Sequence, residues 1–84
     1  MSQRIRSSIP EVEWEDTVTL GKEMTRRDVF KSGEYAGQVI YVRRRRKSGG
    51  SDYGWRDARS APQSKLKTMD DAIGDVLRRR KENS

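Results

Sequence analysis

Five consecutive cations, Arg43 to Lys47, are the residues whose types and spacing point most directly to a chemistry. They end a run typical of a β-strand and precede a Ser-Gly-Gly-Ser segment at residues 48–51. A dense row of like charges repels itself, and contact with phosphates relieves that repulsion most effectively. The run therefore predicts phosphate binding by the end of a hairpin, with nucleic acid as the leading partner and DNA favoured over RNA.

The remaining charge is distributed unevenly along the 84 residues, whose formal net charge is +6. Residues 1–20 contain two cations and four acids, a balance of −2, whereas residues 43–84 contain thirteen cations and six acids, a balance of +7. A surplus concentrated in one half of the chain favours a directional electrostatic footprint over a uniformly basic surface.

The side chains that most often catalyse reactions are missing from the sequence. It contains neither histidine, the usual general base near neutral pH, nor cysteine, and it has no glycine-rich phosphate loop ending in Lys-Ser or Lys-Thr. Strand alternation accounts for the acids near Glu13, and the start of a helix accounts for Asp70 and Asp71. We therefore expect no enzyme activity, no cofactor and no metal site.

The length allows a single domain with a small core, because only 31% of the residues are hydrophobic while 38% are charged. We expect a flexible tail over residues 1–10, one domain over 11–81 and a flexible end over 82–84. No apolar stretch approaches the roughly 18 to 20 residues that cross a bilayer, and the N-terminus lacks the apolar segment of a secretion signal. The predicted location is the cytoplasm, in association with nucleic acid and without a membrane partner.

Hydrophobic patterning predicts the elements of the first half. Residues 12–20 alternate between apolar and polar side chains, which indicates a half-buried strand. Residues 26–32 are predicted to form a short helix, because Thr25 can cap their first amides and Asp28 stands three residues further on. Residues 38–46, rich in β-branched and aromatic side chains, are the clearest strand in the chain.

The second half continues with a turn at residues 47–51 and a strand at 53–59, on which Tyr53 and Trp55 share one face. A short extended piece at 65–67 can pair as a further edge. Thr68 is the expected N-cap of a helix over 69–81, whose acids at the start and cations at the end complement the helix dipole. The predicted fold is α+β, with a small antiparallel sheet of three to four strands packed against this C-terminal helix and one sheet face free to bind.

The order of a strand, a basic turn, an aromatic strand with Tyr-Gly-Trp-Arg at 53–56 and a helix opened by Lys-Thr-Met-Asp-Asp at 67–71 covers residues 38–81. It resembles the small DNA-binding modules built from a three-stranded sheet and one helix, such as the arm-binding domains of tyrosine recombinases and the plant ethylene-response-factor type. In those families the sheet lies in the major groove. The resemblance implies that Arg43, Arg45, Arg56 and Arg59 lie on or near the groove-facing sheet and that Arg44, Arg46 and Lys47 flank it.

Other interpretations of the same residues remain open at the level of sequence. The basic run is also typical of a solvated hairpin end or, in a eukaryotic host, of an import signal. The aromatic residues Tyr53 and Trp55 suit either base stacking or a small core, with the core favoured for Trp55. The alternative function is that of a small inhibitor or adaptor, of the type that phages encode, which docks its basic stretch on an acidic surface of a host protein. The sequence leaves the oligomeric state open.

Overall fold

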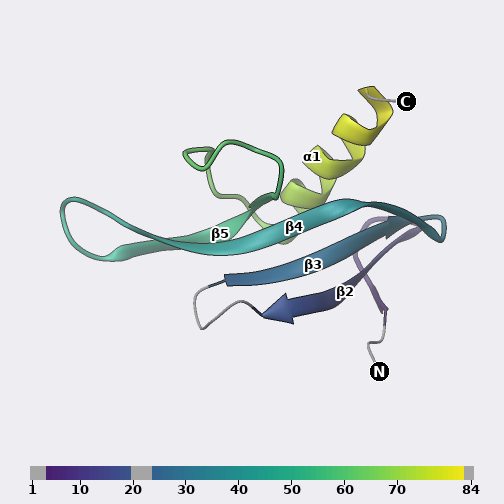
Figure 1. The fold of residues 1–84 in the computed structure, drawn as a ribbon, viewed down its shortest axis with the longest axis horizontal. Helices are drawn as coiled ribbons and strands as arrows, with labels where there is room; N and C mark the ends of the chain where they lie inside the picture. The colour runs from purple at the N-terminus through teal and green to yellow at the C-terminus, as the bar shows by residue number, and fades with distance from the viewer. Residues whose placement is uncertain (1–3, 20–23, 83–84) are drawn as a thin grey trace.

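The chain folds into one antiparallel sheet in which each strand pairs with the next along the sequence, and a C-terminal helix packs against one face (Figure 1). This computed structural model describes residues 4–19 and 24–82. The elements are β1 (Ile5–Arg6), β2 (Val12–Thr19), β3 (Met24–Lys31), β4 (Glu34–Arg45), β5 (Ser51–Asp57) and α1 (Met69–Glu82). The predicted α+β class, with a small antiparallel sheet and a C-terminal helix, is confirmed.

The predicted short helix over residues 26–32 is wrong, because this segment belongs to β3 and lies between β2 and β4 in the sheet. Thr25 therefore caps no helix; it pairs with Tyr41 of β4. Arg27 and Val29 lie on one face of β3, and Arg26 and Phe30 lie on the other, as the two-residue period of a strand requires. Backbone pairing on both sides of the strand outweighs a capping signal that is worth about 1 kcal/mol.

Most other expected elements are present. The strand predicted over residues 12–20 is confirmed as far as Thr19, while Leu20 lies outside the described residues. The predicted edge at 65–67 is confirmed as an isolated bridge between Lys67 and Trp55. The expected N-terminal tail contributes β1, whose two residues pair with Trp14 and Glu13, and this short strand and β3 bring the sheet to five strands. Residues 1–3 of that tail and residues 83–84 of the expected flexible end lie outside the described residues.

The core lies between α1 and the face of the sheet that it covers. Val12, Val29 and Val39 come from three adjacent strands, and Ile73 and Val76 meet them from the helix, all of them buried. Thr68 caps the helix as predicted, because its hydroxyl accepts a hydrogen bond of 3.2 Å from the backbone N–H of Asp71. The helix is thereby held both at its first turn and along its apolar face.

Arg27 is the only cation among the described residues that reaches into this core from the sheet and stacks on both tryptophans. Its guanidinium carbon lies 3.8 Å from the ring centroid of Trp14 and 4.6 Å from that of Trp55. Its Nε donates a hydrogen bond of 2.9 Å to Asp16, and another guanidinium nitrogen contacts the sulfur of Met69 at 3.0 Å. One side chain thus connects β2, β3, β5 and the first turn of α1.

A close approach between β4 and α1 generates a test of this packing. A Cβ placed on Gly37 would lie 2.7 Å from Cγ1 of Val76, and the φ angle of Gly37 is +154°. We expect Gly37→Ala to lower the free energy of unfolding by about 1–3 kcal/mol, because the helix must move away from the sheet. The measurement is the urea unfolding midpoint, followed by circular dichroism.

Gly74→Ala is the matched control, because this glycine lies within α1 and has nothing within 4 Å of the added methyl group. Removing the backbone entropy of a helical glycine should raise the free energy of unfolding by up to about 1 kcal/mol. If the two substitutions changed the free energy of unfolding equally, that result would contradict the close packing of α1 against Gly37.

Candidate nucleic-acid interface

The hairpin formed by β4 and β5 extends beyond the rest of the sheet (Figure 1). The first residue of β3, Met24, pairs with Val42 of β4. Past that point, among the described residues, the next three positions of β4 pair only with β5, in the register Arg43 with Tyr53, Arg44 with Asp52 and Arg45 with Ser51. We call this two-stranded projection, residues 43–53, the basic arm.

The tip of the basic arm is closed by backbone hydrogen bonds between Arg46 and two glycines. The amide of Gly49 donates to the carbonyl of Arg46 over 3.1 Å, and the amide of Arg46 donates to the carbonyl of Gly50 over 3.2 Å. Gly49 and Gly50 have φ angles of +98° and +77°, a region that glycine enters without steric cost. The Gly-Gly pair therefore sets the hairpin turn that the sequence predicts.

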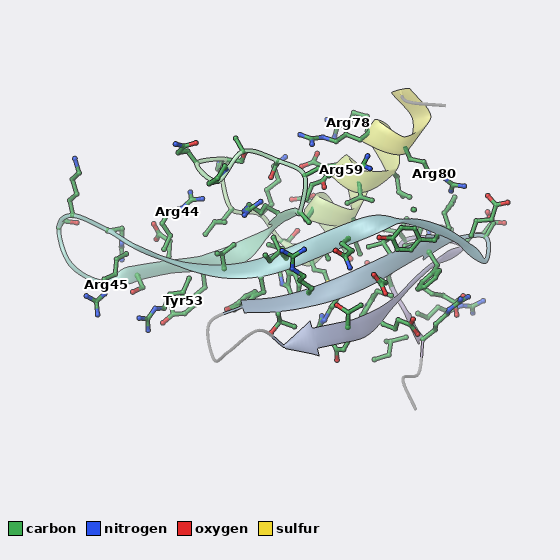
Figure 2. The ribbon with its side chains drawn as sticks, viewed as in Figure 1. Arg44, Arg45, Tyr53, Arg59, Arg78 and Arg80 are labelled. Carbon is green, nitrogen blue, oxygen red and sulfur yellow. The ribbon has the colours of Figure 1, made fainter. Side chains whose placement is uncertain are left out.

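The cations of the arm alternate between its two faces because successive side chains of a strand point to opposite sides. Arg44 and Arg45 point away from each other in Figure 2. Arg44 donates hydrogen bonds of 2.5 Å to the carbonyl of Pro62 and 3.0 Å to that of Ser64. Its guanidinium thus fastens the loop after β5 to the arm.

The outer cations of the arm differ in their partners. Arg46 forms an ion pair of 3.5 Å with Asp52, and both side chains are more than half exposed. Arg45 and Lys47 are exposed and make no ion pair or hydrogen bond with any residue in 4–19 or 24–82. Arg45 and Lys47 are therefore the cations of the arm most readily available to an external anion.

The structure does not bring Arg56 and Arg59 to the basic arm. Arg56 lies three residues beyond Tyr53 at the root of the arm, a separation of about 10 Å at the rise of an extended strand, and Arg59 follows Asp57, the last residue of β5. Arg59 follows that end of the strand, on the helix side of the molecule in Figure 2, far from Arg44 and Arg45. The expected cluster therefore divides into the arm and two separate arginines.

The environment of Arg59 confirms its position at this far end. Its charge acts on Tyr35, whose pKa is raised by partial burial in the first place and by the charge of Asp28 in the second, with Arg59 opposing both. The backbone N–H of Arg59 donates a hydrogen bond of 2.9 Å to Asp57. The Arg59 side chain is exposed but stands apart from the arm.

Arg56 is engaged within the protein and does not share a face of the sheet with Arg43 and Arg45. It pairs with Ile40, and by strand parity it lies on the face opposite to Arg43. Its guanidinium donates to the carbonyls of Asp57 and Ser60 over 3.3 and 3.1 Å, and its Nε is buried without a hydrogen-bond partner. This contact network is typical of a structural arginine that closes a turn.

The sheet face that α1 leaves uncovered is not a basic surface. Gln38 lies between Arg26 and Asp28 and is hydrogen-bonded to both, at 3.3 and 2.9 Å. Ile40 is only 2% exposed, with Arg26 and Arg56 as its cross-strand neighbours on that face. Arginine stems that cover an apolar residue, beside carboxylates, form a mixed surface with little attraction for phosphate.

The arginines near the end of α1 are paired with acids. Arg78 forms an ion pair of 2.9 Å with Asp75, Arg79 one of 3.4 Å with Asp57, and Arg80 one of 2.5 Å with Glu34. The carboxylate of Asp57 is only 4% exposed, so its pairing with Arg79 offsets the cost of burying a charge. Arg79 and Arg80 therefore join the helix to β5 and β4, whereas Arg78 pairs within the helix, and the end of α1 is more than the solvated helix end that the sequence suggests.

Two features of the site are not part of the sequence-based set of site residues. Asp52 opposes the cations of the arm, and Tyr41 lies beside Tyr53 on the face that also carries Arg43. Both could have been identified from the register of the hairpin. A turn at residues 46–50 places residue 45 opposite residue 51, and residue 41 is then opposite residue 55. Among the described residues, no group of acidic side chains converges in a way that could hold a metal ion.

No protein-family model, curated protein or solved structure matches this chain. The resemblance of residues 38–81 to sheet-plus-helix DNA-binding modules therefore stays a prediction. In the described part of the chain, no helix combines the length and the apolar composition needed to cross a membrane.

The role of Arg44 as a fastener for the loop leads to a local test. Arg44→Met keeps the aliphatic stem and removes the two hydrogen bonds to the carbonyls of Pro62 and Ser64. Loss of charged hydrogen bonds worth about 1.5–3 kcal/mol should speed hydrogen exchange of the Ser64 amide by roughly ten- to a hundredfold. NMR-detected exchange of that amide, which is bonded to the carbonyl of Ala61, is the measurement.

Arg45→Met is the control for this experiment, since Arg45 makes no hydrogen bond or ion pair with the described residues of the loop. It removes the same charge from the next position of the same strand. Unchanged exchange at Ser64 in the Arg44 variant would show that the loop is held by other contacts.

Proposed function

We propose that this protein is a non-enzymatic nucleic-acid-binding module, with duplex DNA as its target, and that the basic arm is the element that enters a groove. The observation that carries the proposal is that, among the described residues, β4 beyond Val42 pairs with β5 alone, in a two-stranded ribbon with a cation at every position from 43 to 47. Such a function belongs inside the cell, where the protein would act as an accessory or regulatory factor.

The dimensions of the arm support a major-groove contact. Two paired strands lie about 4.8 Å apart, and the major groove of B-form DNA, about 12 Å wide, admits a two-stranded ribbon. The minor groove, about 6 Å wide, is too narrow for a ribbon with arginine side chains on both faces. Double-stranded RNA is a poorer target, because its major groove is deep and narrow.

The placement of the cations supports a division of roles. Arg45 and Lys47, exposed and unengaged within the described chain, are suited to phosphates on either side of the groove. Arg43 is exposed and lies on the same face as Arg45. Arg44, itself part of the arm, holds the loop that follows β5, whereas Arg56 closes the turn at the far end of that strand.

Removing the two unengaged cations tests the proposal directly. The double variant Arg45→Gln/Lys47→Gln should bind duplex DNA more weakly, and the slope of log affinity against log salt should fall by about 2, one unit for each lost phosphate contact. The measurement is fluorescence anisotropy with labelled duplex at several salt concentrations and excess unlabelled competitor.

Arg59→Gln/Arg80→Gln is the matched control, because it removes the same charge at the far end of the sheet, away from the arm. Its salt slope should stay close to that of the wild type. A slope unchanged in the arm variant would remove the arm from the interface. Absence of binding at physiological salt in the wild type would favour the alternative function, docking on an acidic protein surface, and a pull-down would then follow.

Asp52 supplies a test with the opposite sign. Asp52→Asn releases Arg46 from its ion pair and raises the net charge of the arm by one. We expect tighter binding to duplex DNA and a salt slope increased by up to about 1. Asp16→Asn, a control at a carboxylate of similar exposure, 58% against 54%, lies on β2 and should leave the slope unchanged.

A further inference from the structure

An open cleft of about 810 Å³ lies next to the root of the basic arm, between β4, β5, residues 65–68 and the first turns of α1. It runs from Tyr53, beside the arm, to Arg78 on the helix, both labelled in Figure 2. Tyr41, Tyr53 and Trp55 form its sheet side. We call it the aromatic cleft.

The three rings of the aromatic cleft form a continuous surface. Tyr41 and Tyr53 lie nearly parallel, at 22°, with ring centroids 6.3 Å apart, and Tyr41 meets Trp55 at 5.1 Å and 59°. Trp55 at the inner end packs against the core, whereas Tyr53 at the outer end is 59% exposed. The series of rings therefore ends in an aromatic side chain that is more than half exposed.

The charges around the cleft favour an anionic ligand on the side of the arm. Asp75 lies on α1, on the helix side of the cleft. Its charge is neutralised by ion pairs with Lys67 at 2.6 Å and with Arg78 at 2.9 Å. Lys65 is exposed and makes no ion pair or hydrogen bond with the described residues. Asp71 is the remaining acid of the lining and lies at the start of α1. A bound phosphate therefore gains most near Lys65 and Arg45, with its base turned toward the rings.

An unpaired nucleobase has the chemistry that fits this surface. Every base offers a flat π-face, and stacking on an aromatic side chain is worth about 1–3 kcal/mol per base. Bases within a duplex are already stacked and hidden from a side wall of this kind, so only an overhang, a bulge or an extruded base can reach it. We infer that the aromatic cleft binds an unpaired base of the same nucleic acid whose phosphates contact the basic arm; this inference rests on the proposed function.

The test compares a blunt DNA duplex with the same duplex carrying a short single-stranded thymidine overhang that contains 2-aminopurine. The wild-type protein should bind the overhang duplex about tenfold more tightly than the blunt one, and 2-aminopurine fluorescence should be quenched by stacking. Tyr53→Ala should abolish the quenching and the tenfold advantage, which is the ratio of the two affinities of the same variant, so that any change in affinity for the blunt duplex cancels. Tyr53→Phe, which keeps the ring, should retain both.

Tyr35→Ala is the matched control, because Tyr35 is 57% exposed, close to the 59% of Tyr53, but lies near Arg59 at the far end of the sheet. This variant should keep the overhang advantage. If the wild type binds both duplexes equally and without quenching, or if Tyr53→Ala keeps the advantage, the inference about the cleft is overturned while the proposed function stands. If the wild type binds neither duplex, both are overturned.

Discussion

The stacking of Arg27 between two tryptophans is the interaction on which the rest of the structure depends. The guanidinium is planar and less strongly hydrated than an ammonium group, so it can lie against Trp14 and Trp55 at a modest desolvation cost while it keeps a hydrogen bond to Asp16. A chain with so few apolar residues cannot fill the space between a five-stranded sheet and a helix with hydrocarbon alone. The arginine fills part of that space, and it joins β2, β3 and β5 beneath α1.

This central cation also explains why one local prediction failed. Thr25 and Asp28 suit the start of a helix, but a helix over 26–32 would remove Arg27 and Val29 from the face that α1 covers. Sequence alone predicts the other long elements, because β2, β4 and α1 carry strong periodicity and the turn at Gly49-Gly50 is explicit. The strand conformation of β3 depends on its pairing with β2 and β4 in the folded protein. Short-range sequence signals carry no information on that pairing.

The site was predictable in part for similar reasons. The run Arg43–Lys47 is local, so its place at a hairpin end follows directly from the strand before it and the glycines after it. The separation of Arg59 from the arm depends on strand length and register, and the engagement of Arg44 with Pro62 depends on the path of a loop. Neither the strand register nor the path of the loop can be recognised from residue types. Grouping the arginines by charge alone therefore joins residues that the fold keeps apart.

The two-stranded pairing of the basic arm among the described residues has a consequence for self-association. At residues 44 and 45, no described strand other than β5 pairs with β4, and strand edges of this kind readily pair with the edge of another molecule. Consecutive arginines along that edge oppose the approach of a second identical arm through like-charge repulsion. The same charges therefore oppose edge-to-edge polymerisation of the molecule. Substitutions that neutralise the arm would increase the tendency of the protein to aggregate, besides weakening the proposed binding to nucleic acid.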